Sequence, residues 1–294
     1  MNEIISIGIF KEHFCEIEEI KVSNLIYLLN PARLLKKGNK IHTYADPFLF
    51  EHQNILFLFA EIQENNSAGY INCWKYENEQ WQNLGEILKA TTHFSYPFVF
   101  EDKDGSIYLV PESTETEELN LWVFDNFPKG LRKKHTLLKG SYVDSNIISF
   151  NDVYYLFTTN KDKELVIFFS KNLISDTWTA HPGNPISKDP AISRNGGGVF
   201  FVKNQLIRVA QNCSQRYGGG IVILNVEDLS MISYSETIRN SDFTPQKDYN
   251  WQKTGRHHLS ICKHKSHTFV AIDGYASNTL INRFIKKIAQ FFEL

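Results

Sequence analysis

Short apolar runs joined by polar turns recur along the chain, and each pair of runs has the pattern of a β-hairpin. In the first, "DPFLFEHQNILFLFAE", two apolar runs flank a polar turn at 52–54. Runs rich in β-branched and aromatic residues, bounded by turn residues, predict antiparallel strands. The first hairpin begins at Asp46, and later versions of the unit begin at Tyr96, Asp144, Gly196 and His258.

The unit repeats with a nearly constant period. The five starting residues are separated by 50, 48, 52 and 62 positions. Two further strand-like runs follow each of the first four hairpins, as "GYINCWKY" and "WQNLGEIL" follow the first. Four short strands repeated at this interval are typical of β-propeller blades. The sequence therefore predicts an all-β, five-bladed β-propeller over residues 1–275. A β-sandwich of similar hairpins is the alternative, and it leaves the recurring spacing unexplained.

The two ends of the chain complete this picture. The fifth hairpin ends near Asp273, so we expect the N-terminal run "EIISIGIF" and the apolar run near Leu25 to supply its outer strands and close the ring. Residues 276–294 have apolar positions three or four apart, with arginine and lysine on other faces. They predict a C-terminal amphipathic helix that packs on the propeller or a partner protein, or lies on an anionic membrane surface.

Composition narrows the class of protein. A formal net charge of −2 over 294 residues offers no basic field for a nucleic acid. The four cysteines are scattered without a C-x-x-C pair, which favours reduced thiols in a cytosolic protein over disulfides or a zinc site. The N-terminus lacks the pattern of a signal peptide, and no apolar run is long enough to span a membrane. We expect a cytoplasmic location, with peripheral contact at the inner face of the membrane left open by the C-terminal helix.

Polar residues mark one end of every predicted hairpin. The start of the first strand and the end of the second emerge on the same face, because the two strands are antiparallel. The paired positions are Asp46 with Glu61, Tyr96 with Glu112, Asp144 with Thr159, Gly196 with Gln211, and His258 with Asp273. Residues that precede these starts are His93, Arg194, Asn195, Arg256 and His257. We expect a ring of acids, arginines and histidines around one mouth of the axial channel.

Such a ring suits acid–base or nucleophilic chemistry. Burial and like-charge repulsion raise some carboxyl pKa values in a cluster of this kind, and a carboxylate pair is the minimum for glycosyl transfer. The alternative is that strand ends are polar only because they meet solvent. The loop at 240–255 carries Tyr249 and Trp251, which either stack on a sugar or tuck onto the fifth blade. The chain contains neither G-x-x-x-x-G-K-[ST] nor G-x-G-x-x-G, so the usual nucleotide cradles are not expected.

Several motifs in order resemble a known family. "ADPFLF", "HFSYPFVFE", "IYLVPES", "YVDSNIISF", "SRNGGGVFF" and "GRHHLSI" look like the N-terminal domain of plant glucosamine inositolphosphorylceramide transferases and its bacterial relatives. The match runs from about Ile5 to Tyr275. The resemblance implies a five-bladed propeller similar to that of the arabinanase, β-xylosidase and invertase clans. The bacterial relatives look like components of surface-polysaccharide assembly.

The resemblance also assigns roles, with two departures. Asp46 matches the first-blade acid that serves those hydrolases as base or nucleophile, and Asp144 matches their orienting third-blade acid. The fourth-blade glutamate of arabinanases is missing, because Arg-Asn-Gly stands at 194–196. The second blade has Ser-Tyr-Pro at 95–97 instead of the Arg-Asp-Pro of invertases. Glu112 is then the best available proton donor.

These departures weaken simple hydrolysis and favour transfer. Arg194 and His258 suit the phosphate or diphosphate of a glycosyl donor, and the basic C-terminal helix suits a lipid-linked acceptor. The first hypothesis is a glycosyltransferase of bacterial surface-polysaccharide or glycolipid synthesis, with Asp46 as base or nucleophile, Asp144 as orienting acid and Glu112 as proton donor. The runner-up is a glycoside hydrolase of the arabinanase or xylosidase type that uses Asp46 and Glu112. A non-catalytic propeller that binds glycan or scaffolds partners is the third.

The substrate and the remaining site residues follow from the same hypothesis. The expected ligand is a sugar donor or a glycan. No cofactor or metal ligand is assigned, although an axial Ca²⁺ is left open. The expected substrate-binding residues are His93, Tyr96, Glu61, Arg194, Asn195, Gln211, Tyr249, Trp251, Arg256, His257, His258 and Asp273.

Overall fold

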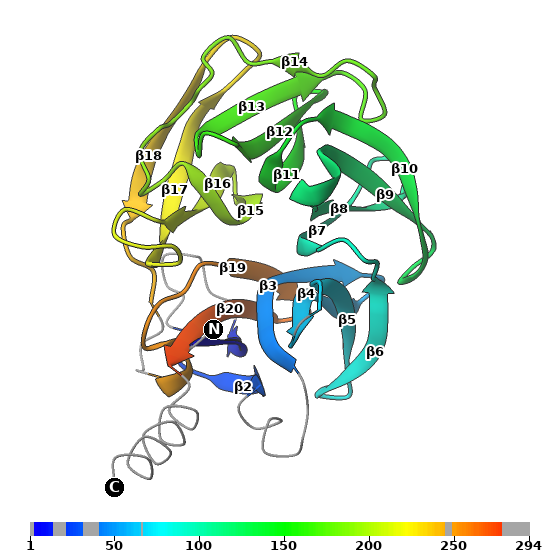
Figure 1. Cartoon of the computed structure of the whole chain (residues 1–294), viewed down its shortest axis with the longest axis vertical. Coiled ribbons are helices and arrows are strands. Elements are labelled where there is room, and N and C mark those ends of the chain that lie inside the picture. Colours follow the sequence, from blue (N-terminus) through cyan, green and yellow to red (C-terminus); the bar gives the residue numbers. More distant parts are fainter. Residues whose placement is uncertain (1–2, 14–21, 32–40, 66, 245–248, 278–294) are drawn as a thin grey trace, which may run out of the picture.

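The computed structural model describes an all-β chain over residues 3–13, 22–31, 41–65, 67–244 and 249–277 (Figure 1). Most of the predicted C-terminal helix, from residue 278 onward, lies outside the described residues. In the described ranges no helix is long and apolar enough to cross a membrane. The helical elements there are two short 3₁₀ turns, η1 (Thr114–Thr116) and η2 (Asn250–Gln252).

The strands fall into five antiparallel units of four within the described part of the chain. Unit 1 is β3 (Ile41–His52), β4 (Ile55–Glu64), β5 (Tyr70–Glu77) and β6 (Gln80–Leu88). Unit 2 is β7 (Ser95–Glu101), β8 (Ile107–Glu112), β9 (Glu118–Asn126) and β10 (Lys129–Lys139). Unit 3 is β11 (Tyr142–Phe150), β12 (Val153–Asn160), β13 (Leu165–Ser170) and β14 (Thr179–Ala180). Unit 4 is β15 (Arg194–Val202), β16 (Gln205–Asn212), β17 (Gly220–Leu229) and β18 (Tyr234–Asn240).

Unit 5 joins strands from the two ends of the chain. It consists of β19 (Leu259–His264), β20 (His267–Ser277), β1 (Glu3–His13) and β2 (Leu25–Leu29). β1 pairs antiparallel with β20 from Glu3 opposite Ser277 to His13 opposite His267, and β2 pairs with β1. This pairing confirms the prediction that the N-terminal runs supply the outer strands of the fifth hairpin. It suits the sequence because Ile7, Ile9 and Phe10 are fully buried there.

The five units surround a common centre, and their first strands β3, β7, β11, β15 and β19 lie nearest to it (Figure 1). Apolar clusters fill the space between neighbouring units. One such cluster joins units 1 and 2 through Phe59, Tyr96 and Leu109, and another joins units 4 and 5 through Val209 and Val270. The fold is therefore β-propeller-like, and it brings the ends of five innermost strands to one place.

The innermost strands share a local distortion that positions the site. The pairing register slips between Ala45 and Phe48 on β3, and it slips at the equivalent points of β7, β11 and β15. In the first three units the residue in the bulge has a left-handed backbone, with φ of 51° at Asp46, 45° at Tyr96 and 51° at Asp144. A bulge re-aims a side chain and leaves its N–H free of the ladder, and residues held in this region cluster at functional sites. The three starting residues predicted from the repeat are thus the three bulge residues.

Candidate functional site

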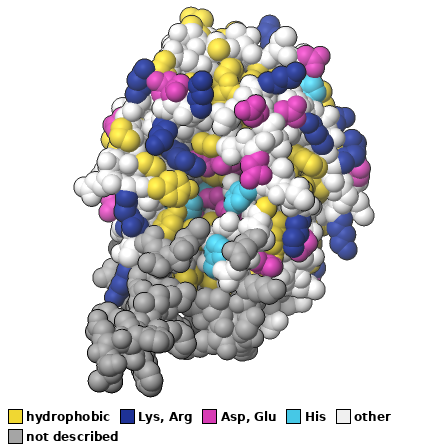
Figure 2. Space-filling view, in the orientation of Figure 1, with side chains coloured by type: hydrophobic (Ala, Val, Ile, Leu, Met, Phe, Trp, Pro, Cys, Tyr) yellow, Lys and Arg dark blue, Asp and Glu magenta, His cyan; other side chains and the backbone are white. Residues whose placement is uncertain are grey.

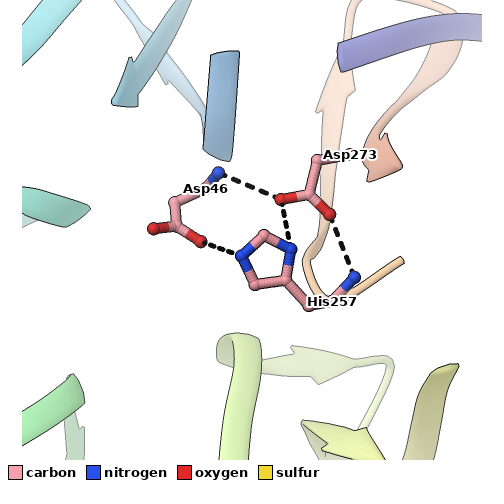
Figure 3. A group of neighbouring side chains, drawn as sticks. All are labelled: Asp46, His257 and Asp273. Carbon is pink, nitrogen blue, oxygen red and sulfur yellow. Dashed lines mark hydrogen bonds and ion pairs between the residues drawn. The ribbon is translucent and has the colours of Figure 1, made fainter. Parts of the chain in front are cut away.

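A buried histidine bridges two buried aspartates where unit 5 meets unit 1 (Figure 3). Nε2 of His257 lies 3.2 Å from Oδ1 of Asp46, and its Nδ1 lies 2.8 Å from Oδ2 of Asp273. Nδ1 of His258 approaches the same Asp46 oxygen at 3.5 Å. The other oxygen, Oδ2, accepts the backbone N–H of Tyr96 at 3.2 Å. The structure therefore brings three of the predicted residues, His257, His258 and Tyr96, onto the Asp46 carboxylate.

Asp273 acts as the anchor of this group. Its Oδ1 accepts the backbone N–H groups of His257 and His258 at 3.0 and 2.9 Å, and its Oδ2 accepts that of Asp46 at 3.1 Å. The side chain is completely buried. Asp273 therefore has its acceptors occupied by the protein and orients the group without meeting a substrate.

The pKa values of Asp46 and His257 shift in opposite directions. Burial alone would raise the pKa of the Asp46 carboxyl, but the contacts from His257 and His258 outweigh it and hold that pKa well below its ordinary value. Burial alone would lower the pKa of His257, but Asp273 raises it well above 6.5. Asp46 is therefore an ionised carboxylate beside an imidazolium at neutral pH.

Asp46, His257 and Asp273 also offer ligand atoms within 4.8 Å of one another, which raises the question of a metal ion. Both ring nitrogens of His257 face carboxylates, and Asp273 already accepts three N–H groups. Ca²⁺ prefers six to eight oxygen ligands. This donor set does not fit an axial Ca²⁺, because protein contacts already satisfy it.

A second acid–histidine pair, Glu61 with His93, lies close by, because Glu61 on β4 pairs with Ala45, the residue before Asp46. Oε1 of Glu61 lies 3.1 Å from Nε2 of His93, and Nδ1 of His93 accepts the N–H of Gly69 at 3.0 Å. Burial raises the pKa of Glu61, whereas the contact with Glu61 raises that of His93. A β-carbon on Gly69 would lie 2.7 Å from both the Glu61 oxygen and the His93 ring, so any larger residue there would force one of these side chains to move.

A third group lies where units 2, 3 and 4 meet. Asp144 and Arg194 form a close ion pair, and Oε2 of Glu112 accepts the backbone N–H of Asp144 at 3.2 Å. Burial raises the pKa of Glu112 well above its ordinary value, and the neighbouring Asp144 adds to the effect. Burial raises the pKa of Asp144 against the opposing charge of Arg194. Glu112 is thus the group most suited to hold a proton at neutral pH.

Two other predicted residues, Asn195 and Gln211, are buried and hold neighbouring groups in place by hydrogen bonds. Asn195 is fully buried, and its amide donates to the Asp144 carbonyl at 2.8 Å and accepts from Nη1 of Arg208 at 3.1 Å. Arg208 is fully buried and pairs with Glu236 at 2.6 Å. Gln211 accepts the N–H of Gly218 at 3.2 Å and so fixes the following turn. Asn195 and Gln211 therefore position other residues, although the sequence predicts that they bind substrate.

Tyr249, Trp251 and Arg256 lie apart from the acids. Trp251 is buried in the apolar cluster between units 4 and 5, and Tyr249 packs edge-on against Phe10. Of the two expectations, the structure favours packing on unit 5 over stacking on a sugar. Arg256 pairs outward with Asp242, with Nη2 and Oδ1 3.4 Å apart. The loop aromatics point inward because the small Gly8 and Gly274 leave room for the indole.

One exposed aromatic residue at the mouth, Tyr217, is not predicted from the sequence. Tyr217 is 51% exposed, and its ring lies 5.0 Å from the Arg194 guanidinium carbon and 5.4 Å from the His257 ring. It follows a strand end by several residues, so the repeat gives no signal for it. Figure 2 shows acidic and histidine side chains gathered at the centre of this face, with lysine and arginine around them.

Comparison with known families matches nearly the whole chain. The family described as "Glucosamine inositolphosphorylceramide transferase 1, N-terminal" matches residues 21–275. "Glucosamine inositolphosphorylceramide transferase 1" of Arabidopsis thaliana is 33% identical over 271 residues, which are 86% of this chain and 35% of that protein. The protein of the same name from Oryza sativa subsp. japonica is 30% identical over 259 residues, 83% of this chain and 34% of its own length. The chain thus spans about a third of these relatives.

Solved structures with a similar fold are carbohydrate enzymes. The GH43_1 enzyme of Xanthomonas citri has a TM-score of 0.57 at 12% identity, over 80% of this chain and 87% of that one. The catalytic domain of Coprinopsis cinerea GH62 α-L-arabinofuranosidase has a TM-score of 0.57 at 11% identity, over 79% and 92%. At these identities the likeness is one of fold alone.

Proposed function

Because the chain belongs to the N-terminal family of glucosamine inositolphosphorylceramide transferases, we propose that it is a carbohydrate-active domain that takes part in glycosyl transfer to a glycolipid. The observation that carries the proposal is that two buried acids at one mouth, Asp46 and Glu112, have pKa values shifted in opposite directions by their surroundings. Asp46 has a lowered pKa and Glu112 a raised one. Two carboxyl groups with divergent pKa values are what chemistry at a glycosidic carbon requires.

The two acids take different roles in this proposal. A carboxylate held by two histidines with a low pKa is a weak base, so of the two roles expected for Asp46 the nucleophile is favoured over the base. The same charge stabilises the positive charge that develops on the sugar ring. Glu112 holds the proton, and the ion pair of Asp144 and Arg194 fixes the geometry beside it.

We propose that the five units form a five-bladed propeller, that β1 and β2 close its ring, and that the site lies at one of its mouths. The support is the set of five four-stranded units and the single parallel contacts that join them, at Ile5 opposite Thr43 and at Gly197 opposite Leu259. The sequence predicts a boundary at 275/276, but β20 runs to Ser277, so the proposed C-terminal helix begins after that residue. A cytoplasmic location beside the inner membrane face also stays part of the proposal.

The relatives do not support the bacterial setting expected from the sequence. The curated relatives reported above are plant proteins, and none of them supports a bacterial surface-polysaccharide pathway. Their name combines glucosamine, inositolphosphorylceramide and transferase activity. The acceptor proposed for this chain is accordingly a lipid whose headgroup carries a phosphorylated ring.

A non-catalytic glycan-binding role is the second candidate, and one observation favours it. Both oxygens of Asp46 are engaged by protein groups, and its side chain is 9% exposed. The chain also spans only about a third of the relatives whose name describes transfer. Under this alternative the mouth recognises a sugar and the chemistry belongs to another domain.

An activity assay separates the candidates. The full chain is incubated with nucleotide-sugar donors and a glycolipid acceptor, and in parallel with aryl glycosides, and products are identified by mass spectrometry. Transfer that is lost in Asp46→Asn supports the proposal. Cleavage of aryl glycosides favours a hydrolase, and saturable sugar binding with no turnover favours the binding domain.

A further inference from the structure

A pocket beside the acids is lined by positive charges and hydroxyl groups. It lies between units 3 and 4 and has a volume of about 470 Å³. Its charged lining residues are Lys161, Lys163 and Arg194, and none of the described acids lines it. Hydroxyl groups come from Ser141, Thr159 and Ser193. The volume suits a ligand of one ring with a phosphate ester.

The two lysines are presented by a rigid turn between β12 and β13. Oδ1 of Asn160 accepts the N–H groups of Asp162 and Glu164 at 2.9 and 3.0 Å, which fixes the backbone between them. Both lysine side chains are exposed. In the described part of the chain neither forms an ion pair, whereas nearby Glu164 is already paired with Lys188 at 2.8 Å. The turn therefore holds two cations that are available to an anion.

Arg194 completes the cationic wall from the other side. Its side chain is 26% exposed, and Asp144 beneath it neutralises one charge and holds the guanidinium in place. Asp162 lies in the turn between the lysines but does not line the pocket. A guanidinium held by a carboxylate on one edge still presents donors on the other, which suits phosphate oxygens.

Tyr217 gives the same pocket an aromatic wall. Its turn is fixed at both ends, because the N–H of Gly218 donates to Gln211 and the N–H of Cys213 donates to the Pro190 carbonyl at 2.8 Å. Half of the Tyr217 side chain is exposed beside Arg194. An exposed, rigidly held aromatic next to hydroxyl groups is suited to the apolar face of a sugar or another polyol ring.

We propose that this pocket binds a polyol ring that carries a phosphate ester, with the phosphate on Lys161, Lys163 and Arg194 and the ring on Tyr217. The inference rests on the proposed function, since it names the part of the substrate that the mouth recognises. The phosphate ester has two sources in that reaction, the headgroup of the lipid acceptor and the diphosphate of the sugar donor. The chemistry that the pocket recognises is the same in both.

Calorimetric titration of the full chain tests the pocket. The probes are myo-inositol 1-phosphate, myo-inositol, inorganic phosphate and a uridine diphosphate sugar, and flotation with vesicles of phosphatidylinositol or phosphatidylcholine adds the membrane-borne form. We expect inositol 1-phosphate to bind better than inositol or phosphate alone, and salt to weaken it because the lysines are exposed. Lys161→Gln with Lys163→Gln should weaken binding by roughly tenfold or more, since two charge-assisted contacts are lost.

Matched variants keep the result specific. Lys171→Gln removes an equally exposed lysine at the opposite end of β13, outside the pocket, and should bind like the unmodified chain. Tyr217→Ala should reduce the preference for inositol 1-phosphate over inorganic phosphate. Preference for the inositol phosphate and its vesicles assigns the pocket to the acceptor, and preference for the nucleotide sugar assigns it to the donor.

Three outcomes would overturn the proposal. The first is that no phosphorylated probe binds saturably, and the second is that Lys171→Gln loses as much affinity as the double lysine variant. The third is that inorganic phosphate binds as tightly as inositol 1-phosphate. Asp46→Asn should retain binding, because Asp46 does not line the pocket. Binding without turnover would thus refute the catalytic proposal alone, and turnover without dependence on the lysines would refute the pocket alone.

Discussion

The hydroxyl of Tyr96 and the backbone of Gly197 bind each other across the centre of the fold. The hydroxyl donates to the Gly197 carbonyl at 2.7 Å and lies 3.2 Å from the Gly197 nitrogen, which donates to it. The side-chain amide of Asn146 adds a third contact at 3.0 Å. Units 2, 3 and 4 therefore meet at one buried phenol, next to the bulges that carry the acids.

Loss of this hydroxyl should destabilise the fold. Tyr96→Phe leaves the Gly197 backbone and the Asn146 amide without their partner in a buried place, at a cost of about 1–3 kcal/mol in the free energy of unfolding. Urea unfolding measures it. Tyr155→Phe is the matched control, because Tyr155 is similarly buried and its hydroxyl makes no hydrogen bond among the described residues. Equal effects of the two substitutions would show that the central phenol has no special role.

Gly69 should control the protonation of His93. In Gly69→Ala the new methyl group would lie 2.7 Å from Oε1 of Glu61 and from the His93 ring, so the pair must separate. The contact with Glu61 is the main cause of the raised His93 pKa, so that pKa should fall toward 6.5 in an NMR titration. Gly198→Ala, whose methyl group would make an ordinary 3.5 Å contact with Phe200, should leave it unchanged. An unchanged His93 pKa in Gly69→Ala would contradict the geometry.

His257 should make stability depend on pH in a defined direction. Its pKa in the folded state is raised well above 6.5, so its contribution is complete below pH 6.5 and is lost as the pH rises through the folded-state value. The difference in unfolding free energy between the unmodified chain and His257→Gln should therefore shrink from pH 6.5 toward alkaline pH.

His264 provides the control of opposite sign. Burial lowers its pKa, so the neutral ring favours the fold, and its contribution grows as the pH rises toward 6.5. Urea unfolding of His264→Gln should show this opposite slope below pH 6.5 and no further change above it, where the His257→Gln difference shrinks. A His257→Gln difference that does not change with pH would mean that His257 is not charged in the folded chain.

The hairpins and their order could be predicted from the sequence because each unit is local. Period-two apolar runs and turn residues predict strands, and the 50-residue interval predicts repeated four-stranded units. The pairing of β1 with β20 also followed, because the fifth hairpin had no outer strands of its own. The identity of the bulge residues could not be read in this way, since a left-handed φ at Tyr96 depends on contacts with distant strands.

The site was predictable as a set of positions and not as a set of roles. Strand-end polarity located Asp46, Glu112, Asp144 and His257, which the structure does bring to one face. It did not distinguish Asn195 and Gln211, whose side chains are buried and hold backbone groups. Tyr217 lay outside the repeat, and Trp251 belonged to the core because an aromatic in a loop gives no direction for its ring.

The central claim is that Asp46 serves glycosyl transfer at this mouth, and product formation by Asp46→Asn tests it most directly. With a nucleotide-sugar donor and a glycolipid acceptor, the full chain should form product, and Asp46→Asn should slow it by at least roughly 100-fold. Asp228→Asn, at an exposed position on β17, should match the unmodified chain. Product formation by Asp46→Asn at the rate of the unmodified chain would contradict the account.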